Sequence, residues 1–362
     1  MTQEPALVIF LGGFGASEAE RLVDGARRAA VLDTLEAWGR QAVLVTDDAG
    51  LACDAPNVTI DCDPGPFHFG RRLAAVVRDH HLGVVLYMGG GSLPLMDAAG
   101  LDAIAASAAS GVAVTNNLYS SDLVAFNAGG SALQVAASTG RDNSLARALK
   151  DEAGLPVEVL PRTLATQYDI DAPADLAVLA VAGLGGPRLR AYLESQDLDT
   201  ARYDAVLPMF LDQAKQIVVA GRVGSHAWSY LERETACRVR LFAEERGMEA
   251  DGREGAARSL LGFYLEEVGL DRFFATLSEL GDAAFIDTRV LLAHKRIEAS
   301  REDRFLSDLG RWQEIREPFL RDFTQAAIAA PMPVILGGHS LMSGGLMALN
   351  EHAWSLRDHG KL

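Results

Sequence analysis

Short apolar runs alternate with longer helical stretches along the first half of the chain, and this alternation limits the possible folds more than any other feature. The runs, which are typical of buried strands, lie at 6–11, 41–46, 83–88, 111–115 and 157–160. Helical spacing of apolar residues is found at 17–38, 70–80, 97–107, 143–152 and 174–182. Repeated strand–helix units predict an α/β domain of three layers, in which helices cover both faces of a mostly parallel sheet.

The second half of the chain shows the same alternation without matching the first half in any motif. Strand-like runs occur at 216–220, 237–242, 284–287 and 333–336, with a helical stretch at 225–235. The intervening sequence Gly-Leu-Gly-Gly-Pro at 183–187 is typical of a linker. A chain of 362 residues also exceeds what one hydrophobic core usually supports. We therefore expect a first domain at 1–182 and a second α/β domain at 188–362.

Charge and composition disfavour several classes of partner. The net charge of −16 repels nucleic-acid phosphates, and no dense cluster of Lys and Arg offsets it. The chain shows neither a basic leader nor an apolar stretch of about 20 residues, so no membrane span is expected. Its cysteines, Cys53, Cys62 and Cys237, show no CxxC spacing, which fits a reducing compartment. We expect a cytoplasmic protein that binds neither nucleic acid nor membranes; the sequence leaves its oligomeric state open and allows an oligomer.

A glycine-rich loop follows the first predicted strand and opens the first predicted helix. It reads Leu11-Gly12-Gly13-Phe14-Gly15-Ala16-Ser17. Small residues leave backbone N–H groups accessible, and the positive end of a helix attracts phosphate. The spacing fits neither the P-loop nor the complete dinucleotide fingerprint. The loop is therefore either a phosphate-binding loop or an ordinary strand-to-helix turn.

Two carboxylates lie just before a proline that favours the start of a helix. Asp169 and Asp171 are two residues apart, and Pro173 is a favoured residue for the start of a helix. Carboxylate oxygens suit a hard cation such as Mg2+. Alternatively, Asp171 simply caps the helix that begins near Pro173. Spacing alone leaves both interpretations open.

The segment Asp-Ile-Asp-Ala-Pro-Ala-Asp-Leu at 169–176 resembles the D-[IV]-D-T-P-x-D-L signature of many GT-A-type nucleotidyltransferases. The likeness is above all to the molybdenum-cofactor guanylyl- and cytidylyltransferases and the phospholactate guanylyltransferase group. Segments at 142–147 and 160–162, with the loop at 11–13, extend the resemblance over about 6–182. It implies a Rossmann-like GT-A domain that transfers a nucleoside monophosphate from a nucleoside triphosphate to a small phosphorylated acceptor. Pyrophosphate is released, and Mg2+ is the implied cofactor.

The resemblance also implies roles for individual residues. It assigns the nucleotide to Leu11, Gly12, Gly13, Gly15, Ser92, Asn116 and Asn117. It assigns catalytic roles to Arg21, Asp169 and Asp171, of which the two aspartates would also hold Mg2+.

This sequence departs from the family's pattern in two places. The turn Gly-Ser-Leu-Pro-Leu at 91–95 carries Ser92 where the family's G-D-x-P-L turn supplies a metal-binding aspartate, and serine is a poor Mg2+ ligand because it is uncharged. The family's first loop carries a lysine, whereas none precedes Lys150 here; its replacement would be Arg21, Arg27 or Arg28. These departures motivate a second hypothesis, a nucleotide- or small-molecule-binding or regulatory protein that keeps the scaffold without catalysis.

Two polar loops of the second half motivate a third hypothesis. Each follows a predicted strand and combines small residues, hydroxyls and a histidine, at 220–226 and 337–345. Such loops can bind phosphate or carboxylate through backbone N–H groups, although ordinary capped turns have the same composition. Here the chemistry would act on a phosphorylated small molecule at a site formed by Arg222, Ser225, His226, Asp287, Arg289, His339 and Ser340.

Overall fold

The computed structural model describes residues 4–48, 50–51, 53, 55–62, 65–248, 252 and 254–362. Contacts divide the chain into two units. Unit 1 is formed by the described residues of 1–14, 27–167 and 185–189, and unit 2 by those of 15–26, 168–184 and 190–362. The segment that resembles the nucleotidyltransferase signature and the start of the first helix therefore belong to unit 2.

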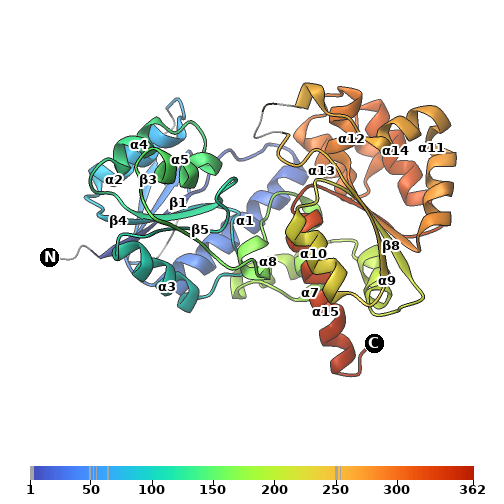
Figure 1. Ribbon diagram of the computed structural model, residues 1–362, viewed down its shortest axis with the longest axis horizontal. Coiled ribbons are helices and arrows are strands. Elements are labelled where there is room, and N and C mark those ends of the chain that lie inside the picture. Colours follow the sequence, from blue (N-terminus) through green and yellow to red (C-terminus); the bar gives the residue numbers. More distant parts are fainter. Residues whose placement is uncertain are drawn as a thin grey trace. The chain divides into compact units, whose positions relative to one another are not determined.

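Unit 1 contains a sheet of seven described strands in the order β3-β2-β1-β4-β6-β5-β7 (Figure 1). The strands are β1 (Pro5–Phe10), β2 (Ala42–Thr46), β3 (Val58–Cys62), β4 (Val84–Gly89), β5 (Ala113–Thr115), β6 (Leu123–Asn127) and β7 (Val157–Val159). β6 is antiparallel to its neighbours β4 and β5, and the other pairs are parallel. The predicted mostly parallel sheet is confirmed, although β3 and β6 were not predicted.

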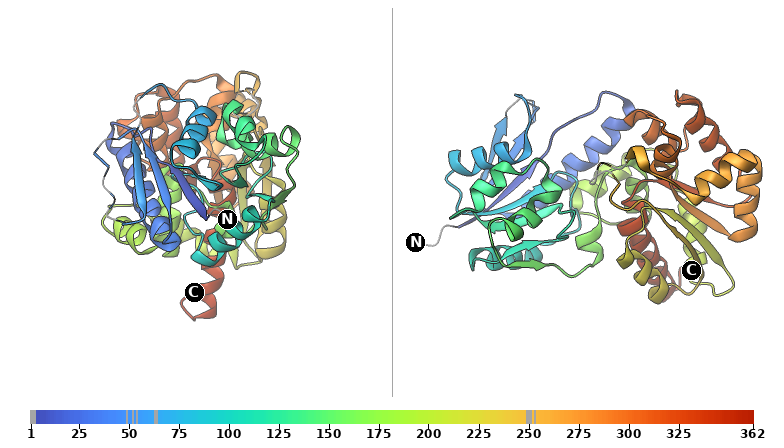
Figure 2. Two further views of the ribbon diagram at one scale, coloured as in Figure 1. Left: turned by 90° about the vertical axis from the view of Figure 1, so that its left-hand side faces the viewer. Right: turned by 45° about the horizontal axis from the view of Figure 1, so that its top comes forward.

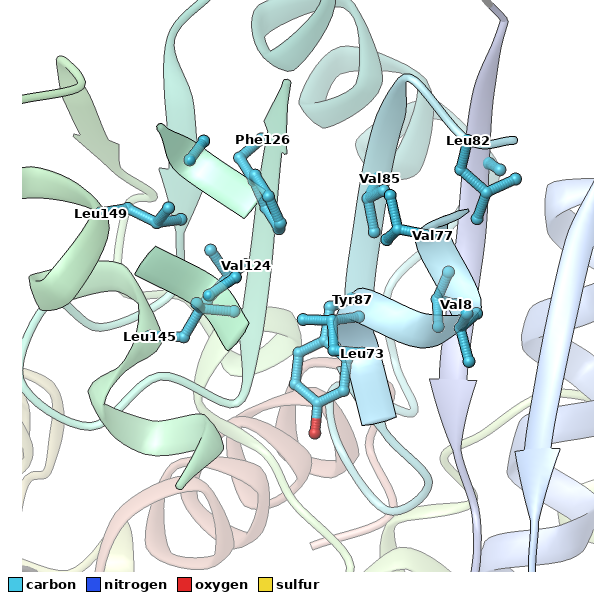
Figure 3. Packing of buried hydrophobic residues seen from close by; sticks show 14 of the residues in the cluster. Val8, Leu73, Val77, Leu82, Val85, Tyr87, Val124, Phe126, Leu145 and Leu149 are labelled. Atoms are coloured by element: carbon cyan, nitrogen blue, oxygen red, sulfur yellow. The ribbon is translucent and has the colours of Figure 1, made fainter. Parts of the chain in front are cut away.

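Helices cover both faces of this sheet. They are α1 (Glu18–Trp38), whose first turns belong to unit 2, α2 (Phe69–Asp79), α3 (Ala98–Ala109), α4 (Ala132–Ser138), α5 (Leu145–Asp151) and α6 (Leu164–Gln167). Side chains alternate between the two faces along each strand. In β1, Val8 packs towards α2, α4 and α5, whereas Leu7 packs towards α3 and the end of α1. Figure 3 shows the first of these two cores, in which Tyr87 lies beside Leu73. The predicted three-layer architecture is confirmed.

Unit 2 contains a sheet of four described parallel strands in the order β11-β10-β8-β9. They are β8 (Gln216–Gly221), β9 (Arg238–Ala243), β10 (Ala283–Asp287) and β11 (Val334–Gly337). The helices are α7 (Pro173–Ala182), α8 (Pro187–Glu194, shared with unit 1), α9 (Ala201–Phe210), α10 (Ser225–Glu234), α11 (Leu260–Leu280), α12 (Thr288–Lys295), α13 (Arg301–Asp308), α14 (Pro318–Ala329) and α15 (Leu346–Asp358), which follows a π-helical turn at Leu341–Gly345.

Both faces of the second sheet are also covered (Figure 2). On one face, Val218 and Ile286 pack with α11, α12 and α14. On the other face, Phe285 meets Phe210 of α9. The prediction that the second half is α/β is confirmed. Among the described helices, none is long and apolar enough to cross a bilayer.

Each sheet contains one point at which the chain reverses the direction in which it adds strands. In unit 1, β2 and β3 extend the sheet on one side of β1, and β4 begins the other side. In unit 2, β9 lies on one side of β8, and β10 and β11 on the other. Ligands of open α/β sheets bind outside the carboxyl ends of the strands at such points. The loops after β1 and β4, and those after β8 and β10, are therefore the places to look for a site.

Candidate functional site

The loop after β1 carries the first glycines of the predicted nucleotide site, and these glycines face a carboxylate. The N–H group of Gly13 donates a hydrogen bond to Oδ2 of Asp47, at 3.1 Å. A methyl group on Gly12 would lie 2.8 Å from Oδ1 of the same side chain. Asp47 directly follows β2, which is the neighbour of β1 in the sheet. The carboxylate of Asp47 therefore already binds part of the backbone that would bind phosphate, and it carries the same negative charge as phosphate.

The second half of this loop opens α1, within unit 2, and is also capped by carboxylates. The N–H group of Gly15 donates to Oδ2 of Asp24, at 2.8 Å. The N–H group and the hydroxyl of Ser17 both donate to Oε2 of Glu20, at 3.1 and 2.9 Å, in a capping-box arrangement. A hydrogen bond from Arg301 is the main cause that lowers the pKa of Glu20 to about 2. Glu20 is therefore negative at neutral pH, and a phosphate approaching this helix end would be repelled.

The arginines that could replace the missing lysine have local partners. Arg21 donates a hydrogen bond to the carbonyl oxygen of Ala16. Arg28 forms an ion pair with Asp48, with 2.7 Å between Nη2 and Oδ2. The guanidinium carbon of Arg28 also lies 4.0 Å from the centre of the Phe14 ring. These contacts give both side chains structural roles that the sequence did not predict.

The turn at 91–95 lies beside the glycine-rich loop. The N–H group of Gly90 donates to the carbonyl oxygen of Phe10, at 2.8 Å, which joins the end of β4 to the end of β1. Leu93 has a φ of 49°, in the left-handed region that a residue with a Cβ rarely adopts. Ser92 is half-buried in this turn. The structure thus places Ser92 in a turn that adjoins the end of β1, where the glycine-rich loop begins, and the turn contains no carboxylate.

Asn116 and Asn117, predicted to contact the nucleotide, stabilise the loop between β5 and β6. Oδ1 of Asn116 accepts hydrogen bonds from the N–H groups of Asp122 and Leu123, at 3.0 and 3.2 Å. Its Nδ2 donates to Oδ2 of Asp122, at 2.9 Å. Oδ1 of Asn117 accepts from the N–H group of Tyr119, at 3.1 Å. Their role in nucleotide binding stays a prediction, and a nucleotide would compete with these bonds.

The start of α7 is capped by Asp175 and not by Asp171. Oδ2 of Asp175 accepts from the N–H groups of Asp171 and Ala172, at 2.9 and 2.8 Å. Its Oδ1 is buried and has no hydrogen-bond partner among the described residues. Burial, together with the charge of Asp171, raises the pKa of Asp175 well above its usual value. The two carboxylates proposed for Mg2+ are therefore not needed to cap this helix.

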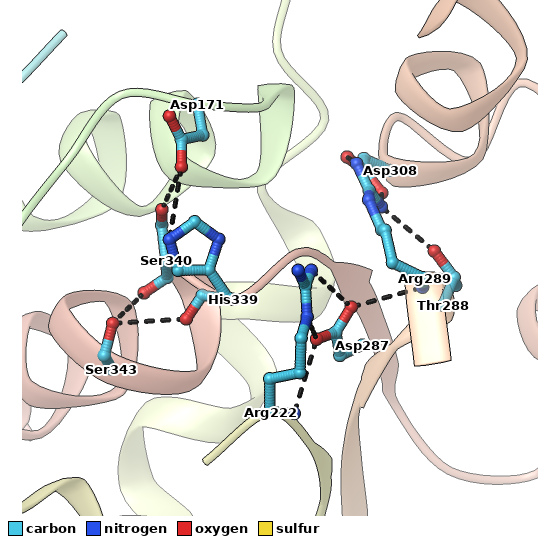
Figure 4. A network of polar contacts seen from close by, with 9 residues as sticks. All are labelled: Asp171, Arg222, Asp287, Thr288, Arg289, Asp308, His339, Ser340 and Ser343. Carbon is cyan, nitrogen blue, oxygen red and sulfur yellow. Dashed lines mark hydrogen bonds and ion pairs between the residues drawn. The ribbon is translucent and has the colours of Figure 1, made fainter. Parts of the chain in front are cut away.

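Asp171 instead contacts the loop that follows β11. Its Oδ2 accepts a hydrogen bond from the Ser340 hydroxyl, at 3.0 Å, and lies 3.5 Å from Nε2 of His339 (Figure 4). Oδ1 of Asp169 accepts from the N–H group of Ile170, at 3.0 Å. Within the described residues, no group of three or more His, Cys, Asp or Glu side chains is placed to hold a metal ion. Asp171 thus has the Ser340 hydroxyl and the His339 ring as neighbours, and the binding of Mg2+ by Asp169 and Asp171 stays a prediction.

A buried ion pair occupies the reversal point of unit 2. Arg222 directly follows β8, and Asp287 is the last residue of β10. Oδ2 of Asp287 accepts from the backbone N–H and from Nε of Arg222, at 3.3 and 2.6 Å, and Oδ1 accepts from Nη2, at 3.1 Å. Burial is the largest influence on the pKa of Asp287 and raises it, but the charge and hydrogen bonds of Arg222, together with the charges of Arg289 and His339, outweigh burial and lower the pKa. The pair is therefore ionised and fixed in orientation.

A second buried ion pair lies next to the first. Arg289, in the first turn of α12, donates from Nη1 and Nη2 to Oδ1 and Oδ2 of Asp308, at 2.5 and 2.6 Å (Figure 4). Nη1 also donates to the Thr288 hydroxyl, at 2.9 Å. Asp308 ends α13, and its side chain is fully buried. Each of the two arginines is thus held in place by its own buried carboxylate.

Gly338, in the loop after β11, faces both guanidinium groups. A methyl group at this position would lie 3.6 Å from Nε of Arg289 and 4.0 Å from Nη2 of Arg222. These are ordinary contact distances, so glycine leaves a space of about one small group against both arginines. His339 follows in the same loop with 54% of its side chain exposed. The candidate site in unit 2 is this space, lined by Arg222, Arg289, Gly338 and His339.

The other predicted residues of the third hypothesis lie at the edge of this site. Ser225 and His226 open α10, and Ser340 precedes the π-helical turn before α15. Sequence reasoning missed Asp308, because it belongs to a helix and meets Arg289 only through tertiary packing. It also missed Asp47, although its position directly after a predicted strand was a usable signal.

No family model matches this chain, and no curated protein matches it. Three solved structures are similar over 54% of this chain. Rv0371c from Mycobacterium tuberculosis H37Rv is 15% identical, with 100% of its chain covered and a TM-score of 0.33. The manganese complex of the same protein is 17% identical, with 100% covered and a TM-score of 0.34. A cytidylyltransferase from Leptospira borgpetersenii serovar Hardjo-bovis (strain JB197) is 12% identical, with 99% covered and a TM-score of 0.37. Similarities this low carry no argument about family, ligand or activity.

Proposed function

We propose that the protein binds a small molecule bearing an oxyanion, of the phosphate or carboxylate class, in unit 2 between the carboxyl ends of β8 and β10. The observation that carries this proposal is the pair of guanidinium groups facing Gly338. The side chains of Arg222 and Arg289 are only 12% and 11% exposed. Nη1 of Arg222 and Nε of Arg289 donate to no other described residue. These donors are therefore available to an acceptor brought by a ligand.

The buried carboxylates support this role because they fix the arginines before a ligand arrives. Arginine loses several rotatable bonds when it is ordered, and a side chain already held in place does not incur that cost on binding. Asp287 and Asp308 each hold one guanidinium through two oxygens, and both side chains are fully buried. Because these paired bonds occupy the fork of each guanidinium, each arginine offers a single further donor to an oxyanion, Nη1 of Arg222 and Nε of Arg289.

The two ion pairs also balance the charge of the site, and this determines how a ligand would be recognised. Each arginine is neutralised by its own aspartate, so the ligand would be recognised mainly through directed hydrogen bonds in a poorly hydrated space. His339 would add positive charge when protonated, since its ring lies in the same loop as Gly338. We therefore expect saturable binding of one anionic group, and not the broad attraction of a basic patch.

The test is calorimetric titration of the whole chain with inorganic phosphate and, separately, acetate, at an ionic strength held constant with NaCl. Saturable binding of either anion at one site is expected, and the tighter of the two identifies the oxyanion. Arg222→Lys should weaken binding by about tenfold or more, because lysine cannot hold Asp287 through two nitrogens and still present a third nitrogen to the anion. Gly338→Ala should weaken binding by filling the space at ordinary contact distance from both arginines.

Arg272→Lys is the matched control, since Arg272 forms an exposed pair with Glu279 on α11. Its anion binding should equal that of the unaltered protein. Thermal unfolding of each variant separates a lost site from a lost fold. Absence of saturable binding by the folded protein, or equal binding by Gly338→Ala and the unaltered protein, would refute the proposal.

A second candidate function is the nucleotidyl transfer that the sequence resemblance implies. The observation in its favour is that the loop after β1 and the turn at 91–95 adjoin at the reversal point of unit 1. It would require the carboxylates of Asp47 and Glu20 to leave the backbone N–H groups that they occupy. Pyrophosphate release from GTP, CTP, ATP or UTP in the presence of Mg2+ and a phosphorylated acceptor, lost in Asp169→Ala, would support it. No release with any of the four nucleotides would leave anion binding in unit 2 as the function.

A further inference from the structure

The two guanidinium groups of the candidate site in unit 2 offer a ligand few donors. Asp287 accepts from Nε and Nη2 of Arg222, and Asp308 accepts from Nη1 and Nη2 of Arg289. Nη1 of Arg222 and Nε of Arg289 are the nitrogens that donate to neither carboxylate. Gly338 faces both groups and has no side chain that could donate. Each arginine therefore presents one nitrogen to the same small space, and the two nitrogens come from the ends of two strands.

This arrangement satisfies only a small number of ligand oxygens. A carboxylate has two oxygens in one plane, and each of them can accept from one arginine. A phosphoryl group has three strong acceptor oxygens, so one of them would be without an arginine donor. A buried acceptor without a donor keeps the full cost of its lost hydration. His339 lies on the exposed side of the site, where water is available to either ligand, and so does not distinguish them.

The charges around the site also limit the charge of the ligand. Asp287 and Asp308 balance the two arginines, and Asp171 adds a carboxylate 3.5 Å from Nε2 of His339 (Figure 4). Burial is the largest influence on the pKa of Asp308 and raises it above its usual value, although the bound arginine opposes this. The cost of moving an ion from water into a medium of low dielectric grows with the square of its charge. A dianion is therefore disfavoured far more strongly here than a monoanion.

We propose that the ligand of this site is a carboxylate, which the site selects over phosphate. This inference rests on the proposed function. The planar carboxylate would lie beside Gly338, with one oxygen towards Arg222 and the other towards Arg289. Of the three side chains that line the site, only that of His339 is more than half exposed, so the organic part of the ligand would extend past His339.

The experiment compares acetate, inorganic phosphate and methanesulfonate by calorimetric titration of the whole chain. The pH is about 8, where phosphate is mainly a dianion, and ionic strength is held constant with NaCl. Acetate should bind at least about tenfold more tightly than phosphate, because phosphate carries more charge and more acceptors than the site can satisfy. Methanesulfonate is a monoanion with three oxygens. Its affinity should lie between the other two, since it shares the charge of acetate but not its shape.

Two variants change the charge around the site with little change in shape. Asp308→Asn removes a buried negative charge, and Asp171→Asn removes a partly exposed one, so that at least the second variant keeps the core intact. Both should reduce the preference for acetate over phosphate by about threefold or more. Asp322→Asn is the matched control, because Asp322 is an exposed aspartate of α14. It makes the same change of charge in unit 2 and should leave the preference unchanged. Thermal unfolding of each variant verifies its fold.

The outcomes separate this inference from the proposed function. Phosphate affinity equal to or above that of acetate would overturn the carboxylate assignment, and saturable phosphate binding would at the same time uphold the anion site. Methanesulfonate affinity equal to that of acetate would also overturn the assignment, since charge alone would then decide. So would an equal preference in Asp171→Asn and the control. Failure of both acetate and phosphate to bind would overturn the anion site itself.

Discussion

Replacing Asp287 by alanine removes the carboxylate at the centre of the candidate site in unit 2. Three donors of Arg222 and the backbone N–H group of Arg289 lose their acceptor. The Arg222 side chain is 12% exposed in the unaltered protein, too buried for water to replace the lost charge fully. We therefore expect a large loss of stability, and not the small effect of a surface pair.

The magnitude follows from two terms. Breaking a buried ion pair by removing one partner costs about 3 to 5 kcal/mol, mainly because the other charge is left uncompensated. Asp287 also caps α12 through the N–H group of Arg289, and a lost cap costs about 1 kcal/mol. The free energy of unfolding should fall by about 4 to 6 kcal/mol, a large part of the roughly 5 to 15 kcal/mol typical of a domain. Adding Arg222→Leu should recover part of this loss, since the unpaired charge is then absent.

Urea unfolding followed by tryptophan fluorescence measures this change, because Trp228, Trp312 and Trp354 all belong to unit 2. Glu279→Ala is the control. It breaks a pair with Arg272 in which both side chains are more than 60% exposed, and it should cost about 0 to 1 kcal/mol. A cost of Asp287→Ala no larger than that of the control would refute the reasoning. So would a double variant less stable than Asp287→Ala alone.

Three further predictions concern single groups. Because the pKa of Asp175 is raised by burial, its contribution to stability is full below pH 3.8 and lost as pH rises; Asp175→Asn should remove this pH dependence in urea unfolding, so the stability of the variant relative to the unaltered protein should increase as the pH rises above 3.8. The pKa of Glu20, lowered from 4.5 to about 2 by Arg301, gives stability that is present above pH 4.5 and lost as pH falls to about 2; the difference between the unaltered protein and Glu20→Gln should shrink over that range. Gly221→Ala should lower the thermal midpoint strongly, because φ is 141° and a methyl group would lie 2.2 Å from Cβ of Asp287.

The layer architecture could be predicted from the sequence because buried parallel strands leave visible apolar runs. β3 and β6 lacked that signal for different reasons. β3, Val58–Cys62, is an edge strand, and its residues are only half-buried or exposed. β6, Leu123–Asn127, is apolar, but it directly follows a polar loop that was interpreted as part of a ligand site. Whether a strand inserts antiparallel depends on its pairing with the neighbouring strands, and the spacing of apolar residues along the chain carries no information about that pairing.

The sites differed in how much of them the sequence could reveal. Arg222, Asp287 and Arg289 were predicted together because each follows a strand, and the carboxyl ends of parallel strands share one edge. Asp308 gave no comparable signal, since its position depends on how α13 folds back over that edge. The motif of the first half suggested that Asp169 and Asp171 act as a pair. In the structure, Asp171 bonds to Ser340 and lies near His339, a contact over 169 residues that spacing cannot predict.

The two strand-to-helix loops show why a glycine-rich pattern alone does not identify an anion site. Both present small residues and a helix start, and both lie at a reversal point of their sheet. After β1, Asp47, Asp24 and Glu20 accept the N–H groups, so an anion would have to displace side chains of its own charge that are tethered in place. After β8, the carboxylate of Asp287 binds the guanidinium group of Arg222, and the N-cap residue of α10 is Gly224, which has no side chain to accept from the backbone. The same residue type thus blocks one loop by accepting from its backbone and prepares the other by orienting its arginine. For that reason we assign ligand binding to unit 2, although the family-like motif was the more specific signal in the sequence.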